Sequence, residues 1–242
     1  GYTKYPPVAG FPELRKAIAE KFQRDNALTF ATEQVMVCTG AKQCIANAML
    51  SIVNPGDEVI IPSPFWVTYA DLVKLAEGIV VQVQGEFEND FKITPDQLEA
   101  AITEKTRCFI FSSPCNPTGS IYTKDELAGL ATVFERHPEI YIISDEIYEH
   151  INFEGKHQSI AQFPAIADRV IVINGLSKAF AMTGWRLGFM AGPKDLIKAS
   201  EKIQSQFTSG PNSITQRAAI AALNGDMRPT EEMRKSFQER RD

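Results

Sequence analysis

The sequence lacks the features that define several classes of protein. It has no apolar run long enough to span a membrane, and its four cysteines and three histidines show none of the spacings of zinc sites or CxxC redox pairs. No GxGxxG motif follows the first apolar run, which disfavours a nicotinamide-dependent dehydrogenase. A net charge of -5 and a pI near 5.4 argue against a nucleic-acid-binding surface. We therefore expect no metal, no membrane contact and no nucleic-acid partner.

The few cysteines and the first residues together predict a cytoplasmic protein. Three of the four thiols (Cys38, Cys44, Cys108 and Cys115) lie in or beside apolar runs, which favours buried, unpaired cysteines in a reducing compartment. The chain begins with neither Met nor the basic-then-apolar pattern of a signal peptide. We expect it to be an excerpt of a longer protein.

Seven short apolar or β-branched runs predict a sheet. They are residues 35–38, 58–61, 79–83, 107–111, 140–143, 170–173 and 187–191. Most runs are continuous rather than alternating, which is typical of strands covered on both faces, as in a mostly parallel sheet. With 242 residues, 44% of them hydrophobic, the chain is long enough for one large domain.

Helical patterns alternate with these runs, so the fold class is α/β. The expected helices span residues 11–24, 41–53, 66–77, 94–102, 195–207 and 214–223, and another begins at Thr123, with Glu126 as its capping-box partner. Residues 224–242 are charged and polar. They are interpreted either as the exposed start of another helix or as a solvated tail.

Five motifs follow five of the apolar runs directly. They are residues 40–42, 63–66, 113–119, 145–148 and 177–178. In an open α/β sheet, ligands bind beyond the carboxyl ends of the parallel strands. The five motifs are therefore predicted to meet at one edge of the sheet and to form one site.

The segment between Gly175 and Gly188 is the most informative motif. Lys178 follows an apolar run, and Arg186 lies eight residues further on. A lysine at a strand end can form a Schiff base with an aldehyde cofactor, and an arginine beside it can bind the phosphate of that cofactor in a bidentate fork. This segment resembles the pyridoxal-phosphate attachment site of class I aminotransferases of the aspartate aminotransferase kind. Some relatives carry a serine where Gly175 stands.

The other motifs supply groups that such a cofactor needs. A buried Asp145 would be stabilised by a protonated pyridine nitrogen, although helix N-capping is the simpler interpretation of an isolated aspartate. Tyr148, one helical turn beyond Asp145, and Asn116 can donate to the ring oxygen; their alternatives are a packed ring and a turn former. Trp66 can stack on the ring, or be a core aromatic.

The phosphate requires further donors, and the reaction requires a base. Gly40, Ala41 and Lys42 open a helix whose backbone N–H groups form an anion site, and Ser177 can add a hydroxyl group. The free amine of Lys178 can move a proton between the substrate Cα and the cofactor C4′. These residues form our expected site, with Lys178, Asp145 and Tyr148 as its catalytic members.

The resemblance implies more than these residues indicate by themselves. It implies a three-layer α/β/α fold with a seven-stranded, mostly parallel sheet whose last strand is antiparallel. Residues 1–223 would be the cofactor-binding large domain of a bacterial-type aspartate aminotransferase, and 224–242 the connection to a small domain that is absent. The implied reaction transfers an amino group from aspartate, or a related amino acid, to 2-oxoglutarate in a pyridoxal/pyridoxamine phosphate ping-pong cycle.

Three further expectations depend on the same resemblance. Tyr5 reaches the phosphate of the neighbouring subunit, so the protein is a homodimer. Lys42, with Trp66 and Asn116, contacts the substrate, and Lys42 meets the distal carboxylate. The Ser63–Pro64 and Asn116–Pro117 bonds are cis.

Alternatives on the same fold stay open. They are an aromatic or prephenate aminotransferase, a pyridoxal-phosphate-dependent β-lyase, and a domain that binds the cofactor without turnover. A domain without turnover stays possible because the small domain, which the resemblance implies would carry the arginine for the substrate α-carboxylate, is absent.

Overall fold

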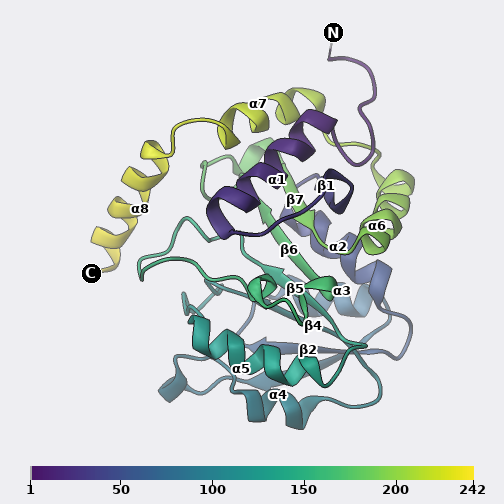
Figure 1. Ribbon diagram of the computed structural model, residues 1–242, viewed down its shortest axis with the longest axis vertical. Helices are drawn as coiled ribbons and strands as arrows, with labels where there is room; N and C mark the ends of the chain where they lie inside the picture. Colours follow the sequence, from purple (N-terminus) through teal and green to yellow (C-terminus); the bar gives the residue numbers. More distant parts are fainter. Residues whose placement is uncertain (1) are drawn as a thin grey trace.

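A single seven-stranded sheet forms the centre of the computed structural model, which describes residues 2–242 (Figure 1). The strands are β1 (Val35–Cys38), β2 (Glu58–Ser63), β3 (Ile79–Gln84), β4 (Thr106–Ser112), β5 (Tyr141–Asp145), β6 (Val170–Gly175) and β7 (Gly188–Ala191), in the order β1-β7-β6-β5-β4-β2-β3. β7 is antiparallel to both of its neighbours, and the other pairs are parallel. The predicted sheet and its antiparallel last strand are confirmed.

Burial explains why most strands read as continuous apolar runs. Every residue of β1, β6 and β7 is buried, because these strands have neighbours on both faces. β3 lies at the edge of the sheet, and its residues are exposed or half-buried, including Gln82 and Gln84. The polar residues in this run therefore reflect the exposure of β3, whereas β1, at the other edge of the sheet, is apolar and fully buried.

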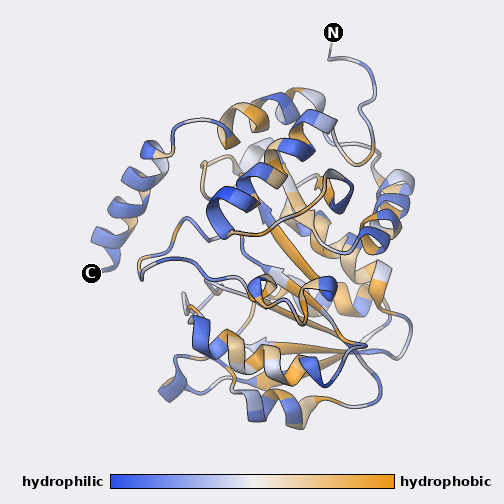
Figure 2. Cartoon of the chain, viewed as in Figure 1, coloured by the Kyte–Doolittle hydropathy of each residue, from blue (hydrophilic) through white to orange (hydrophobic). Residues whose placement is uncertain are grey.

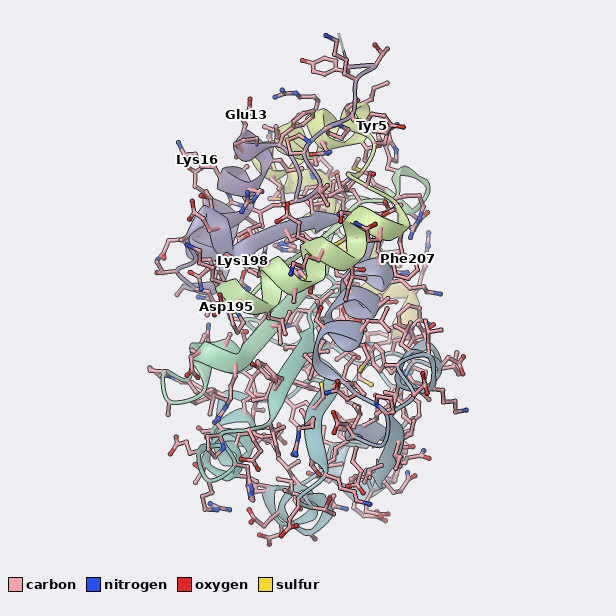
Figure 3. The ribbon with its side chains drawn as sticks, turned by 90° about the vertical axis from the view of Figure 1, so that its right-hand side faces the viewer. Tyr5, Glu13, Lys16, Asp195, Lys198 and Phe207 are labelled. Carbon is pink, nitrogen blue, oxygen red and sulfur yellow. The ribbon has the colours of Figure 1, made fainter. Side chains whose placement is uncertain are left out.

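Helices cover both faces of the sheet, which gives the predicted three layers. One face packs against α1 (Pro12–Asn26), α4 (Pro95–Ala101), α5 (Lys124–Glu135) and α7 (Ser213–Leu223), and the other against α2 (Ala41–Ile52), α3 (Thr68–Leu75) and α6 (Lys194–Phe207). Short 3₁₀ turns occur at Thr32–Gln34, Phe87–Asn89, Ile160–Gln162, Ala167–Arg169 and Thr183–Trp185. In Figure 2 the sheet is largely hydrophobic, and the helices have hydrophilic outer faces. Figure 3 shows α6 crossing one outer face between Asp195 and Phe207.

Local signals set the helix boundaries. The predicted capping box of α5 is present, with the Thr123 hydroxyl accepting from the Glu126 N–H and the Glu126 carboxylate accepting from the Thr123 N–H. α3 is shorter than the predicted helix over 66–77. It ends early because Glu77 adopts a left-handed conformation (φ 59°), and it starts late because Trp66 belongs to the loop after β2.

The polar C-terminal segment forms a helix, α8 (Arg228–Arg241), which stands away from the sheet (Figure 1) and is largely hydrophilic (Figure 2). The Thr230 hydroxyl donates to the Ala179 carbonyl at 2.7 Å and ties the helix start to the loop after β6. Of the two interpretations of this segment, the structure has the helix. Within residues 2–242 no helix is both long enough and apolar enough to cross a membrane.

Candidate active site

The five strand-end motifs meet at a cavity of about 300 Å³. β1 and β6 are both antiparallel to β7, so β1 runs in the same direction as the parallel strands, and their carboxyl ends share one edge. The expected residues on the cavity wall are Ala41, Lys42, Trp66, Asn116, Asp145, Tyr148, Ser177, Lys178 and Arg186. The predicted convergence of the motifs is therefore present in the fold.

The loops after β2 and β4 turn sharply at this edge. The Ser63–Pro64 and Asn116–Pro117 peptide bonds are cis, as expected, and Ser113–Pro114 is also cis. The Asn116 N–H donates to the Ser112 hydroxyl at 3.3 Å, which joins the turn to the end of its own strand. Asn116 is half-buried beside the cavity.

One end of the cavity carries positive charge. Gly40 precedes α2 with φ 89°, so the first N–H groups of that helix and its dipole lie beside the cavity. Arg186 packs directly on Gly40: a Cβ atom there would lie 2.3 Å from the Arg186 Nη2 atom. The Arg186 Nη1 atom donates to the Thr183 carbonyl at 2.8 Å. A helix N-terminus and a guanidinium group thus form an anion site.

A carboxylate, of opposite charge to the anion site, lies at the end of β5. Asp145 is buried, and burial raises the pKa of its carboxyl group to about 6, against the hydrogen bonds from Tyr69 and the Ile147 N–H, which lower it. A cation next to this carboxylate would offset the cost of its burial. Asp145 closes a strand rather than capping a helix, and turns, not a helix, follow it. The predicted helical turn between Asp145 and Tyr148 is thus wrong, yet both residues line the cavity.

Lysines and aromatic rings form the remaining walls. The Lys178 Nζ atom lies 5.3 Å from the centre of the Tyr148 ring, and the Lys42 Nζ atom lies 4.9 Å from the Trp66 ring. Lys178 and Ser177 follow β6 and are half-buried, whereas Lys42 is exposed at the cavity mouth. The cavity therefore holds one sheltered amine and one open to solvent.

Four wall residues were not among the expected ones: Tyr69, Ser112, Ile147 and Thr183. Tyr69 lies in α3, where its spacing from Val73 reads as an ordinary core position. Ser112 ends β4, so the rule that strand ends carry site residues also applied to it. Tyr5, in contrast, is 94% exposed and is not on the wall of this chain's cavity.

The side chains that line the cavity fit pyridoxal phosphate. The anion site between α2 and Arg186 matches a phosphate, and the buried Asp145 carboxylate matches a protonated pyridine nitrogen. Lys178 lines the same cavity and supplies an amine. An arginine, a carboxylate and a lysine on one wall are the donor set that this cofactor requires.

Comparisons with known proteins agree with this donor set. Residues 1–242 match the family described as aminotransferase class I and II. An aspartate/prephenate aminotransferase of Cereibacter sphaeroides is 52% identical over 100% of this chain and 61% of that protein. An aspartate aminotransferase of Bacillus subtilis is 50% identical over 99% of this chain and 61% of that protein.

A solved structure is similar over the same extent. The crystal structure of the aspartate aminotransferase from Rhizobium meliloti has a TM-score of 0.98 and 46% identity, covering 100% of this chain and 61% of that one. This chain thus spans about 61% of the length of these relatives.

Proposed function

Because this chain belongs to the class I and II aminotransferases, we propose that it is the cofactor-binding domain of a pyridoxal-phosphate-dependent enzyme that transfers the amino group of aspartate to 2-oxoglutarate. The products are oxaloacetate and glutamate, so the amino group and the oxo group are exchanged. One observation carries the proposal: a single cavity holds a sheltered lysine, a buried carboxylate and an arginine-flanked helix N-terminus.

Asp145 controls the electronics of the site. Bound pyridoxal phosphate supplies an aldehyde that condenses with amines and a protonated ring that withdraws electrons from the substrate Cα. Asp145 would keep the ring nitrogen protonated, because that cation would stabilise its buried carboxylate. Asn116 and Tyr148 bind the ring oxygen from loops after β4 and β5.

Lys178 is the covalent anchor and the proton carrier. Its amine would hold the cofactor through the aldehyde group, and as a free amine it would be the base that carries a proton between the substrate Cα and the cofactor C4′. The half-buried position of Lys178 in the loop after β6 keeps this amine inside the cavity. The centre of the Tyr148 ring lies 5.3 Å from the Lys178 Nζ atom, so this ring borders the space in which the amine moves.

The phosphate end fixes the position of the cofactor. The Gly40 N–H donates to the Cys38 carbonyl at 2.8 Å, so the next N–H groups of the helix start, at Ala41 and Lys42, would bind the phosphate. The Ser177 hydroxyl and the Arg186 guanidinium would add further donors. Trp66, on the cavity wall, would stack on the cofactor ring and exclude water from that face.

Lys42 is the residue that we assign to substrate choice. Its exposed ammonium group, above Trp66 at the cavity mouth, can bind the distal carboxylate of aspartate or glutamate. Prephenate is a second candidate acceptor, because the Cereibacter sphaeroides relative is named for aspartate and prephenate. Prephenate, like aspartate and glutamate, carries a second carboxylate that Lys42 could bind.

The whole protein would contain more than this domain. Residues 1–223 form the large domain, and 224–242 begin the connection to a small domain that completes the substrate site. Two chains form a homodimer in which Tyr5, exposed on its own chain, reaches the phosphate of the neighbouring site (Figure 3). We propose the cytoplasm as the location of the enzyme.

Activity assays on the full-length protein test this function. With pyridoxal phosphate bound, we expect glutamate and oxaloacetate to form from aspartate and 2-oxoglutarate. A second assay replaces 2-oxoglutarate with prephenate as the amino acceptor. Lys42→Met is expected to raise the KM for dicarboxylates more than that for monocarboxylate amino acids. No amino transfer from any amino acid in the cofactor-loaded protein would refute the proposed function.

A further inference from the structure

We propose that Tyr69 is a positioning residue that holds the Asp145 carboxylate in the orientation in which it meets the cofactor ring. This inference rests on the proposed function, because it assigns a partner to the residue that binds the ring nitrogen. Tyr69 lies in the first turn of α3, and Asp145 ends β5. Its hydroxyl group donates to the Asp145 Oδ2 atom at 2.6 Å.

Two donors fix both oxygens of this carboxylate. Oδ2 accepts from Tyr69, and Oδ1 accepts from the Ile147 N–H at 3.3 Å. The second contact is local, whereas Tyr69 is 76 residues away in the chain and belongs to another layer of the fold. Tyr69 is 1% exposed, so its ring cannot swing to another rotamer without disturbing the core. The shorter contact therefore sets the plane of the carboxylate.

The direction of this hydrogen bond is fixed. Burial, followed by the Asp145 charge, raises the pKa of Tyr69 well above its ordinary value, so the phenol stays protonated and donates. The other titratable groups that act on Asp145 are Glu146 beside it, Lys178 after β6 and Cys44 in α2. Burial has the largest effect on the Asp145 pKa and raises it, and the hydrogen bond from Tyr69 is the largest of the effects that lower it. Tyr69 thus favours the ionised form that a pyridinium requires.

Tyr69 also ties the carboxylate to the stacking wall. Its N–H donates to the Trp66 carbonyl at 2.9 Å, and the two rings meet edge to face with centroids 5.7 Å apart. One short segment therefore carries the ring that covers the cofactor face and the hydroxyl that orients its acid partner. A shift of Tyr69 would move both.

Tyr69→Phe in the full-length protein isolates the hydroxyl group, because it keeps the ring in the core. Pyridoxal phosphate binding is measured by absorbance from pH 5 to 9. Loss of a hydrogen bond to a charged group is expected to weaken binding by about 10- to 100-fold at neutral pH. It should also move the midpoint of the pH profile upward by about one unit, since Asp145 ionises less readily.

Tyr122→Phe is the matched control. Tyr122 is also buried, and its hydroxyl oxygen accepts from the Ile93 N–H at 3.0 Å rather than donating to Asp145. This variant should lose some stability and leave the pH midpoint of binding unchanged. Replacement of Tyr69 by 3-fluorotyrosine, a stronger donor, should lower the midpoint, which is opposite to the effect of Tyr69→Phe and independent of whether that variant folds.

The outcomes separate this inference from the proposed function. Wild-type affinity and midpoint in folded Tyr69→Phe would overturn the role of Tyr69 while the proposed function stands. If the unaltered protein does not bind pyridoxal phosphate, the proposed function fails. Carbon-13 NMR titration of Asp145 in the cofactor-free protein then still decides whether removal of the Tyr69 hydroxyl shifts the Asp145 carboxyl group, and an unshifted titration overturns the inference.

Discussion

At the residue scale, the chemistry of the site depends on the burial of one charge. The unfolded chain ionises Asp145 near the ordinary pKa of 3.8, whereas burial raises the pKa in the folded protein to about 6. Between these values the folded state binds more protons, so the cofactor-free protein loses stability as the pH rises. A bound cation reverses this loss, and the binding of the cofactor is thereby coupled to folding.

Asp145→Asn should therefore stabilise the cofactor-free protein and abolish the function. A two-unit shift corresponds to roughly 3 kcal/mol, and the new amide donors offset part of it, so we expect a gain of about 1–2 kcal/mol at pH 7.5. Urea unfolding at several pH values measures this gain. The difference from the wild type should shrink as the pH falls from 6 to 4; a variant that is less stable at pH 7.5 would contradict the account.

Gly40 is a second position where one atom matters. Its φ of 89° disfavours side chains, and a Cβ atom would lie 2.3 Å from the Arg186 Nη2 atom. Gly40→Ala should displace Arg186 and weaken the binding of pyridoxal phosphate by at least about tenfold, since a charged hydrogen bond is lost. Gly56→Ala is the control, because Gly56 has a similar φ of 87° and open space around it. Equal cofactor affinity in both variants would refute the anion site.

At the element scale, the loop after β5 has two functional faces. Asp145 and Tyr148 line the cavity, whereas Glu146 and Glu149 point into a buried polar network. Glu146 accepts hydrogen bonds from the Ser144 and Ser159 hydroxyls, and Glu149 is paired with Lys21 of α1. The network thus connects the first helix to the loop that carries the cofactor ligands.

Lys21→Met tests that connection. Burial raises the pKa of Glu149, but the Lys21 charge and then His150 outweigh it, and the net pKa lies well below the ordinary value. Without Lys21 the buried carboxylate is uncompensated, so we expect a loss of about 3–5 kcal/mol of unfolding free energy at pH 7. The loss should decrease at low pH, where Glu149 becomes protonated.

Lys16→Met on the same helix is the control, because Lys16 forms an exposed pair with Glu20 and should change stability little. If both methionine variants unfold at the same urea concentration as the wild type, the buried pair does not hold α1 to the loop.

The sequence predicts the strands and loops that carry the site better than it predicts the contacts between their side chains. The strand ends were predictable because apolar runs mark strands and parallel strands share an edge, and Lys178 and Asp145 follow from that rule. Arg186, which precedes the antiparallel β7, was predicted from its spacing to Lys178 instead. Tyr69 was not, because its hydroxyl meets Asp145 only through the packing of α3 on the sheet. The same holds for Lys21 and Glu149, which long-range packing brings together. Periodicity reports which face is buried and not which polar atoms meet there.

At the scale of the whole molecule, the proposed dimer completes the site. Tyr5 is 94% exposed and is not on the wall of its own chain's cavity, so its hydroxyl is accessible to a neighbouring chain. The same outer surface includes Phe207 at the end of α6, with 73% of its side chain exposed (Figure 3).

Tyr5→Phe in the full-length protein should leave the dimer intact and weaken pyridoxal phosphate binding by about fivefold or more, because one hydrogen bond to a charged phosphate is lost. Analytical ultracentrifugation measures the assembly, and absorbance titration measures the affinity. Tyr2→Phe, at another exposed tyrosine of the same segment, is the control. Unchanged affinity in Tyr5→Phe would remove Tyr5 from the proposed neighbouring site.

The most direct test of the central claim identifies the lysine that binds the cofactor. The full-length protein is incubated with pyridoxal phosphate, reduced with borohydride and digested, and the peptides are analysed by mass spectrometry. We predict the pyridoxyl group on Lys178, with Lys42 of the same cavity unmodified as an internal control. A label on Lys42 or on another lysine, or no label on a folded protein that has bound the cofactor, would contradict the account.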